Sequence, residues 1–89
     1  MQFQHYDLGH MCAGEMVEVS LAGNAANVLL LDSANLGHFK RGARYRYFGG
    51  QQTNSLGRLR VPSSGHWHVV IHLGGYAGRV AQAFVNSTN

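Results

Sequence analysis

Two histidines, His66 and His68, are the residues of this sequence whose types and spacing first indicate chemistry. Residues two apart on a β-strand project from the same face, about 6.6 Å apart, so two imidazoles there can reach one metal ion. His72 lies about 13 Å beyond His68 on a straight strand and is too far away to join them. A third ligand would come from a neighbouring strand, and His5 and His10 are the histidines whose positions this geometry leaves open. Two interpretations follow: a metal- or small-ligand-binding module, or two histidines on a solvent-facing strand.

Four arginines form a second group. Arg44 and Arg46 alternate with tyrosines, and Arg58 and Arg60 follow a polar stretch that would join two strands of a hairpin. On such a hairpin the four guanidinium groups would share one face and repel one another unless an anion or an acidic partner met them. The alternatives are an acidic protein surface, such as the Glu15–Glu18 strand of another copy, an anion, or a solvated face on which the arginines have no partner. Nucleic acid is a weaker candidate, because the interleaved tyrosines fall on the opposite face and cannot stack beside the arginines.

No segment carries a complete catalytic motif. Cys12 and His10 are two residues apart in a loop, which is not the arrangement of a thiol and its base. The glycine-rich stretch at residues 74–78 lacks the lysine and the strand-to-helix context of a phosphate loop, and predicts a hairpin turn instead. We therefore expect no enzyme and no cofactor. The sequence favours a non-catalytic binding or protein-interaction module.

The histidine pair lies in the stretch with the clearest period-two pattern. From residue 66 to 73, Trp67, Val69, Ile71 and Leu73 share one parity, and three histidines and Val70 share the other. This alternation is typical of a half-buried strand. We expect a central strand whose Trp67 face lies in the core.

Further strands are predicted where alternating or continuous apolar runs lie between turn residues. They span residues 2–7, 15–21, 27–32, 44–48, 56–61 and 79–85, with a long loop at 49–55 and frayed residues at 86–89. The four consecutive apolar residues within 27–32 indicate a second central strand. Asp32 and Ser33 can cap one short helical turn near residues 33–41, which we interpret as a connection and not as a layer. No helix is long enough to connect parallel strands, so the fold class is all-β: an antiparallel β-sandwich, jelly-roll-like or a partly open barrel, of about seven strands.

Length and composition restrict the remaining possibilities. The 89 residues predict a single domain over 1–89, and charged residues are 12% of the chain. About 25% is usual, and so little charge predicts a homo-oligomer. All four acidic residues lie within 1–39, whereas all seven lysines and arginines lie within 40–89. One cysteine and the lack of a leader predict a reducing, cytoplasmic location, and no apolar run reaches the length of a membrane span.

Five short stretches carry a resemblance to a known family. They read MQFQHYDLGH at residues 1–10, GNAANV at 23–28, LDSAN at 31–35, YRYFGG at 45–50 and VPSSGHW at 61–67. Together they resemble the bacterial family called domain of unknown function 1883. The resemblance covers nearly the whole chain and implies a small β domain that is sometimes joined to TIR-type domains, which would suit a sensing or interaction module. It implies no catalytic residue.

Overall fold

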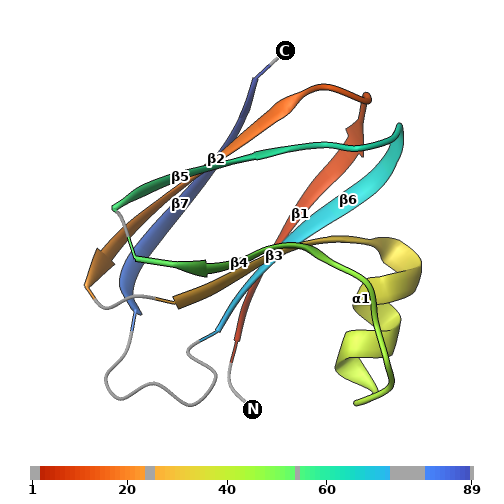
Figure 1. Ribbon diagram of the computed structural model, residues 1–89, viewed down its shortest axis with the longest axis horizontal. Helices are drawn as coiled ribbons and strands as arrows, with labels where there is room; N and C mark the ends of the chain where they lie inside the picture. The colour runs from red at the N-terminus through yellow and green to blue at the C-terminus, as the bar shows by residue number, and fades with distance from the viewer. Residues whose placement is uncertain (1–2, 24–25, 54, 73–79, 89) are drawn as a thin grey trace.

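The structure is a computed structural model that describes residues 3–23, 26–53, 55–72 and 80–88. Over these residues the chain forms seven strands and one helix (Figure 1). The elements are β1 (Gln4–Met11), β2 (Met16–Gly23), β3 (Ala26–Asp32), α1 (Ser33–Lys40), β4 (Phe48–Gln52), β5 (Leu56–Arg60), β6 (Gly65–His72) and β7 (Val80–Thr88).

The strands form two antiparallel sheets that face each other. One sheet has the order β1-β6-β3-β4 and the other the order β5-β2-β7. The predicted all-β sandwich is confirmed, and the two sheets do not close into a barrel. As predicted, β6 and β3 are central strands, because each has hydrogen-bonded neighbours on both sides. The remaining strands of the first sheet, β1 and β4, are its two edges.

The main core fills the space between the sheets. Trp67, Val69 and Ile71 of β6 point into it, at 4%, 0% and 2% exposure, as their parity predicts. Val17 and Val19 of β2 meet them from the opposite sheet and are fully buried. Burial of about 25 cal/mol per Å² of apolar surface on both sheets holds the sandwich together.

The outer face of β6 is also covered, which the sequence pattern did not predict. Val70 is fully buried and His68 is 6% exposed, so β6 is not a half-buried strand. The cover is α1, whose Leu36 and Phe39 pack with Val70 and neighbouring β3 leucines in a second core cluster. The expectation that this helix is only a connection is therefore wrong.

Helix α1 begins as the sequence predicts. The carboxylate of Asp32 accepts a hydrogen bond from the Asn35 backbone N–H at 2.8 Å, which satisfies one of the free donors of the first turn. The helix ends at Lys40, and Arg41 provides its C-terminal cap. In the described part of the chain no helix is both long and apolar enough to span a membrane.

The fourth strand lies later than predicted. The expected strand at 44–48 and loop at 49–55 are wrong, since residues 43–47 are irregular and β4 spans Phe48–Gln52. Two contacts hold the irregular segment against the helix: the Tyr45 ring meets Phe39 at a centroid distance of 5.2 Å, and the Arg46 backbone N–H donates to Asn35 Oδ1 at 2.8 Å. These tertiary contacts override the β-propensity of the alternating tyrosines.

Three strands, β1, β2 and β7, extend beyond their predicted ends. β1 continues through Gly9 because a bulge between Asp7 and Gly9 lets it keep pairing with β6. β7 includes residues 86–88, which were predicted to fray, because they pair with the start of β2. The turn predicted at residues 74–78 lies outside the described residues.

Candidate functional site

The pairing of β1 with β6 gathers ligand-type side chains on the outer face of the first sheet. Asp7 lies directly opposite His68 in the register of the two strands, and His66 shares the His68 face. One ligand atom from each of Asp7, His66 and His68 lies within 4.8 Å of the others. We call these three residues the Asp-His cluster.

Hydrogen bonds link the cluster to two further residues. His66 Nε2 and Asp7 Oδ1 are 2.6 Å apart, and the rings of His66 and His68 stack at 4.7 Å. His68 has a partner at each ring nitrogen: His5 Nε2 lies 2.9 Å from Nδ1, and Ser33 Oγ lies 2.9 Å from Nε2. The first residue of α1 therefore closes one side of the cluster, and β1 closes the other.

Exposure differs sharply across the cluster. His68 is 6% exposed, whereas the side chains of His66 and Asp7 are 50% and 56% exposed. Burial lowers the pKa of His68 below its usual value, and the nearby Asp7 carboxylate offsets part of that effect. Burial also lowers the pKa of His5, with Lys40 acting in the same direction. The neutral imidazole, which is the form that binds metals, is therefore favoured at His5 and His68.

A bulge and its hydrogen bond hold the Asp7 carboxylate. The Gly9 backbone N–H donates to Asp7 Oδ1 at 2.8 Å, and this bond is the main reason why the pKa of Asp7 is lowered, followed by the bond to His66. Gly9 has a φ of 70°, which is the left-handed region that glycine adopts easily. The carboxylate is thus ionised at neutral pH and aimed at β6.

The structure revises the histidine prediction. His66 and His68 share a face as predicted, and His5, one of the two expected neighbours, contacts His68. The sequence reasoning missed Asp7, although the period-two pattern that places His5 on a face also places Asp7 there. His72 stays apart, as predicted, and its ring lies near Phe39. Its Nδ1 is buried and has no hydrogen-bond partner among the described residues, and burial lowers the pKa of this histidine. Whether His66 and His68 bind a metal stays a prediction.

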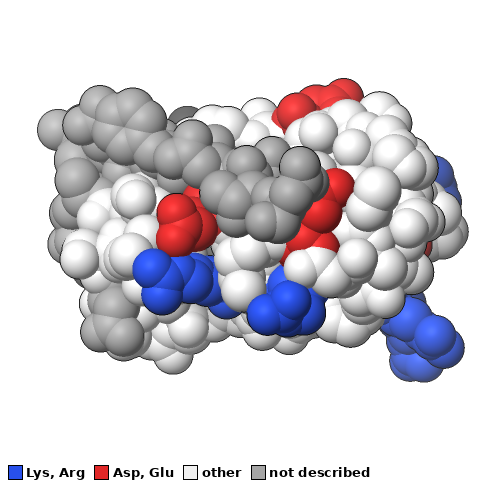
Figure 2. Space-filling model, turned by 90° about the horizontal axis from the view of Figure 1, so that it is seen from above, with Lys and Arg blue, Asp and Glu red and all other residues white. Residues whose placement is uncertain are grey.

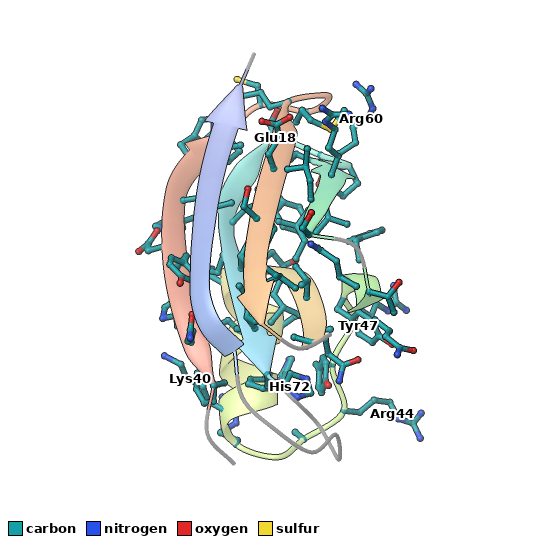
Figure 3. The ribbon with its side chains drawn as sticks, turned by 90° about the vertical axis from the view of Figure 1, so that its left-hand side faces the viewer. Glu18, Lys40, Arg44, Tyr47, Arg60 and His72 are labelled. Carbon is teal, nitrogen blue, oxygen red and sulfur yellow. The ribbon has the colours of Figure 1, made fainter. Side chains whose placement is uncertain are left out.

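The arginine prediction fails in its geometry. Arg58 and Arg60 lie on β5 in one sheet, whereas Arg44 and Arg46 lie in the irregular segment that precedes β4 of the other sheet. Arg60 and Arg44 lie at opposite ends of the molecule (Figure 3). The four do not share a face, because the strand that was to pair Arg44 and Arg46 with β5 does not form.

Arg58 and Arg60 also have partners within the chain. Arg58 Nε donates to Glu18 Oε2 at 2.8 Å across the β2–β5 pair. Arg60 donates to the Gly14 carbonyl oxygen at 2.9 Å. Figure 2 shows one face of the molecule, on which basic side chains lie beside acidic ones and form no continuous basic patch.

Arg44 and Arg46 remain exposed beside aromatic residues. Within the described ranges neither guanidinium group has a hydrogen bond or an ion pair. The next two residues, Tyr47 and Phe48, are 47% and 48% exposed. Figure 3 shows Arg44 and Tyr47 on the same side of the molecule. We call Arg44, Arg46, Tyr47 and Phe48 the basic aromatic edge, since they lead into the edge strand β4.

A groove lies beside this edge. It has a volume of about 220 Å³ and is lined by residues of β4 and β5 together with Val28 and Thr53. Leu56, which lines it, is 45% exposed, and Arg58 is the one charged residue among its described lining residues. These lining residues include no carboxylate, histidine or cysteine.

Comparison with known families identifies the chain. A family model described as Domain of unknown function (DUF1883) matches residues 1–89. The chain therefore belongs to this family, as the five sequence stretches predicted. Comparisons with curated proteins and with solved structures gave no match.

Proposed function

We propose that this protein is a non-catalytic interaction module that binds an acidic segment of another protein at the basic aromatic edge. The observation that carries the proposal is the pair of exposed guanidinium groups, Arg44 and Arg46, that have no acidic partner in the described structure and lie next to exposed aromatic rings. Arginine beside tyrosine is the composition enriched in protein-binding hot spots. The described lining of the adjacent groove offers no carboxylate or histidine, which supports a binding role over catalysis.

Charge decides what kind of partner fits. The chain has four acidic residues, and each is already engaged within the chain. Asp7 contacts His66, Glu15 accepts from the Cys12 backbone N–H, Glu18 pairs with Arg58, and Asp32 caps α1. A second copy could offer only carboxylates that are already shared with a partner inside that copy. An acidic segment of a different protein supplies unshared carboxylates, so we assign the partner of Arg44 and Arg46 to a different protein.

The edge also favours a protein over a nucleic acid. Tyr45, which would be needed as a second stacking platform, packs against Phe39 and is half buried. Two guanidinium groups neutralise few phosphates, whereas base stacking and phosphate contacts must both extend along a strand. An acidic peptide with apolar residues uses all the parts present: the arginines, the exposed rings and the groove beside β4.

Fluorescence anisotropy with a labelled peptide of alternating glutamate and valine tests the proposal. The double variant Arg44→Gln/Arg46→Gln removes two exposed ion pairs of about 0.2–1 kcal/mol each, so the affinity should fall about twofold to thirtyfold. The matched control is Lys40→Gln/Arg60→Gln, which removes the same net charge at sites away from Arg44 (Figure 3) and should bind like the wild type. Equal losses in both double variants, or tighter binding of a single-stranded oligonucleotide than of the peptide, would contradict the proposal.

We propose that the module also self-associates, in a reducing cytoplasmic setting. The low charge content and the exposed Leu56 and Phe48 support association through uncharged surface, since the four carboxylates are engaged. Light scattering of the chain alone measures this directly, and a monomer at high concentration would count against it.

A further inference from the structure

We infer that Asp7, His66 and His68 form a binding site for one divalent transition-metal ion, with zinc as the reference ion. The inference is independent of the proposed function, because the site lies across β1 and β6 and the basic aromatic edge leads into β4, the other edge of the same sheet. It rests on the convergence of one carboxylate and two imidazoles from two paired strands.

The donor set selects the class of metal. Two imidazole nitrogens and one carboxylate oxygen suit zinc, copper or nickel, whereas calcium and magnesium prefer sets made entirely of oxygen. Three protein ligands leave a further coordination position for a water or for a group of a bound molecule. The site is therefore open toward solvent on the side of His66 and Asp7, whose side chains are 50% and 56% exposed.

The ligand atoms must rearrange to hold an ion. They now lie within 4.8 Å of one another. Ligands at about 2.1 Å from a tetrahedral zinc lie about 3.4 Å apart. His66 and Asp7 are the exposed members and can close this difference by side-chain rotation, while buried His68 serves as the fixed ligand. The hydrogen bond between His66 Nε2 and Asp7 Oδ1 is 2.6 Å long, so an ion would separate these two atoms and replace their hydrogen bond by two metal–ligand bonds.

The residues around His68 match the supporting shell of a metal site. A metal-bound histidine holds its orientation by a hydrogen bond through its other ring nitrogen. His68 has partners at both nitrogens, His5 on one side and Ser33 on the other. The ion displaces one of them, and the remaining partner fixes the ring.

Calorimetric titration of the untagged, chelator-treated chain with zinc tests the inference. The wild type should bind one zinc ion per chain. Asp7→Asn and His66→Ala should each lower the affinity at least about tenfold, because even loss of a supporting partner at a metal site has an effect of that size. Both residues are exposed, so neither change should prevent folding. His38→Ala is the matched control, since His38 lies on α1 and contacts Arg41, away from the cluster.

A second readout separates site binding from binding to scattered histidines. Zinc should raise the urea midpoint of the wild type and of His38→Ala, and should raise that of Asp7→Asn and His66→Ala by a smaller amount at the same zinc concentration. An unchanged midpoint in the wild type would overturn the inference. Equal zinc affinity in all four proteins would overturn it as well.

Discussion

Replacing Gly49 by alanine should destabilise the protein far more than the same change at the neighbouring Gly50. Both glycines lie in β4 with positive φ, 107° at Gly49 and 138° at Gly50. Alanine at either position therefore suffers backbone strain of about 1–3 kcal/mol. The surroundings differ: a Cβ at Gly49 would overlap the Val28 carbonyl oxygen and contact Leu59, whereas a Cβ at Gly50 would meet nothing within 4 Å.

The size of the difference follows from what the overlap would break. Gly49 lies opposite Leu29 in the β3–β4 register, so relieving the overlap moves β4 away from β3. Loss of about two ladder hydrogen bonds at about 0.5–1.5 kcal/mol each adds about 1–3 kcal/mol to the strain. Gly49→Ala should then cost about 2–6 kcal/mol in total, a large share of the roughly 4–13 kcal/mol expected for a domain of this size.

Urea unfolding followed by tryptophan fluorescence measures both variants. Trp67 is the single tryptophan, is 4% exposed, and lies 6.1 Å from the Phe48 ring of β4, so it reports on the sandwich and on this strand. If the two variants had equal unfolding free energies, or if Gly49→Ala were as stable as the wild type, the close approach of β4 to β3 would be refuted. The earlier expectation of a loop at residues 49–55 gives no reason for the two glycines to differ.

Two further predictions concern the outer face of the first sheet. Acidification should destabilise the metal-free protein. Burial lowers the pKa of His72 in the folded chain below 6.5, so as the pH falls the unfolded chain takes up a proton on this histidine before the folded chain does. The free energy of unfolding therefore decreases as the pH falls below 6.5. Urea midpoints measured against pH in the presence of EDTA check this, and His72→Gln should show a shallower decline; a midpoint that rises on acidification would contradict the reasoning. Asp32→Ala should cost about 1 kcal/mol by removing the cap of α1, while Asp32→Asn, which can still accept the Asn35 N–H bond, should cost less. Equal unfolding free energies for these two variants would show that the cap contributes nothing.

The sequence predicted those features that depend on neighbours along the chain. Alternation within one strand is local, which is why the inward direction of Trp67, Val69 and Ile71 could be predicted. The capping of α1 by Asp32 is local too. Burial of His68 is not a local feature, because it depends on α1, whose first residue, Ser33, lies 35 residues earlier in the chain. Period-two alternation identifies two faces of a strand but does not tell which of them another element covers.

The place of Asp7 shows the same limit for the candidate site. Its parity with His5 could be predicted, but its position opposite His68 depends on the pairing of strands far apart in the chain and on a bulge between Asp7 and Gly9 that shifts the register. The shift allows two pairs to form together: Asp7 lies opposite His68, and His10 lies opposite His66. The bulge thus lets β1 place a carboxylate as well as a histidine beside the two histidines of β6.

The Asp7 carboxylate changes the chemistry of the histidine face. Three histidines would form a neutral ligand set, whereas an ionised Asp7 adds a negative charge that favours a cation beside two imidazoles. In the absence of metal, the same carboxylate hydrogen-bonds His66, and the buried ring of His68 keeps partners on both sides. Helix α1 excludes water from His68 but leaves His66 and Asp7 accessible, so the face is neither a solvated strand surface nor a closed core. A buried, fixed ligand beside two exposed, movable ones is an arrangement that can take up an ion without unfolding any strand.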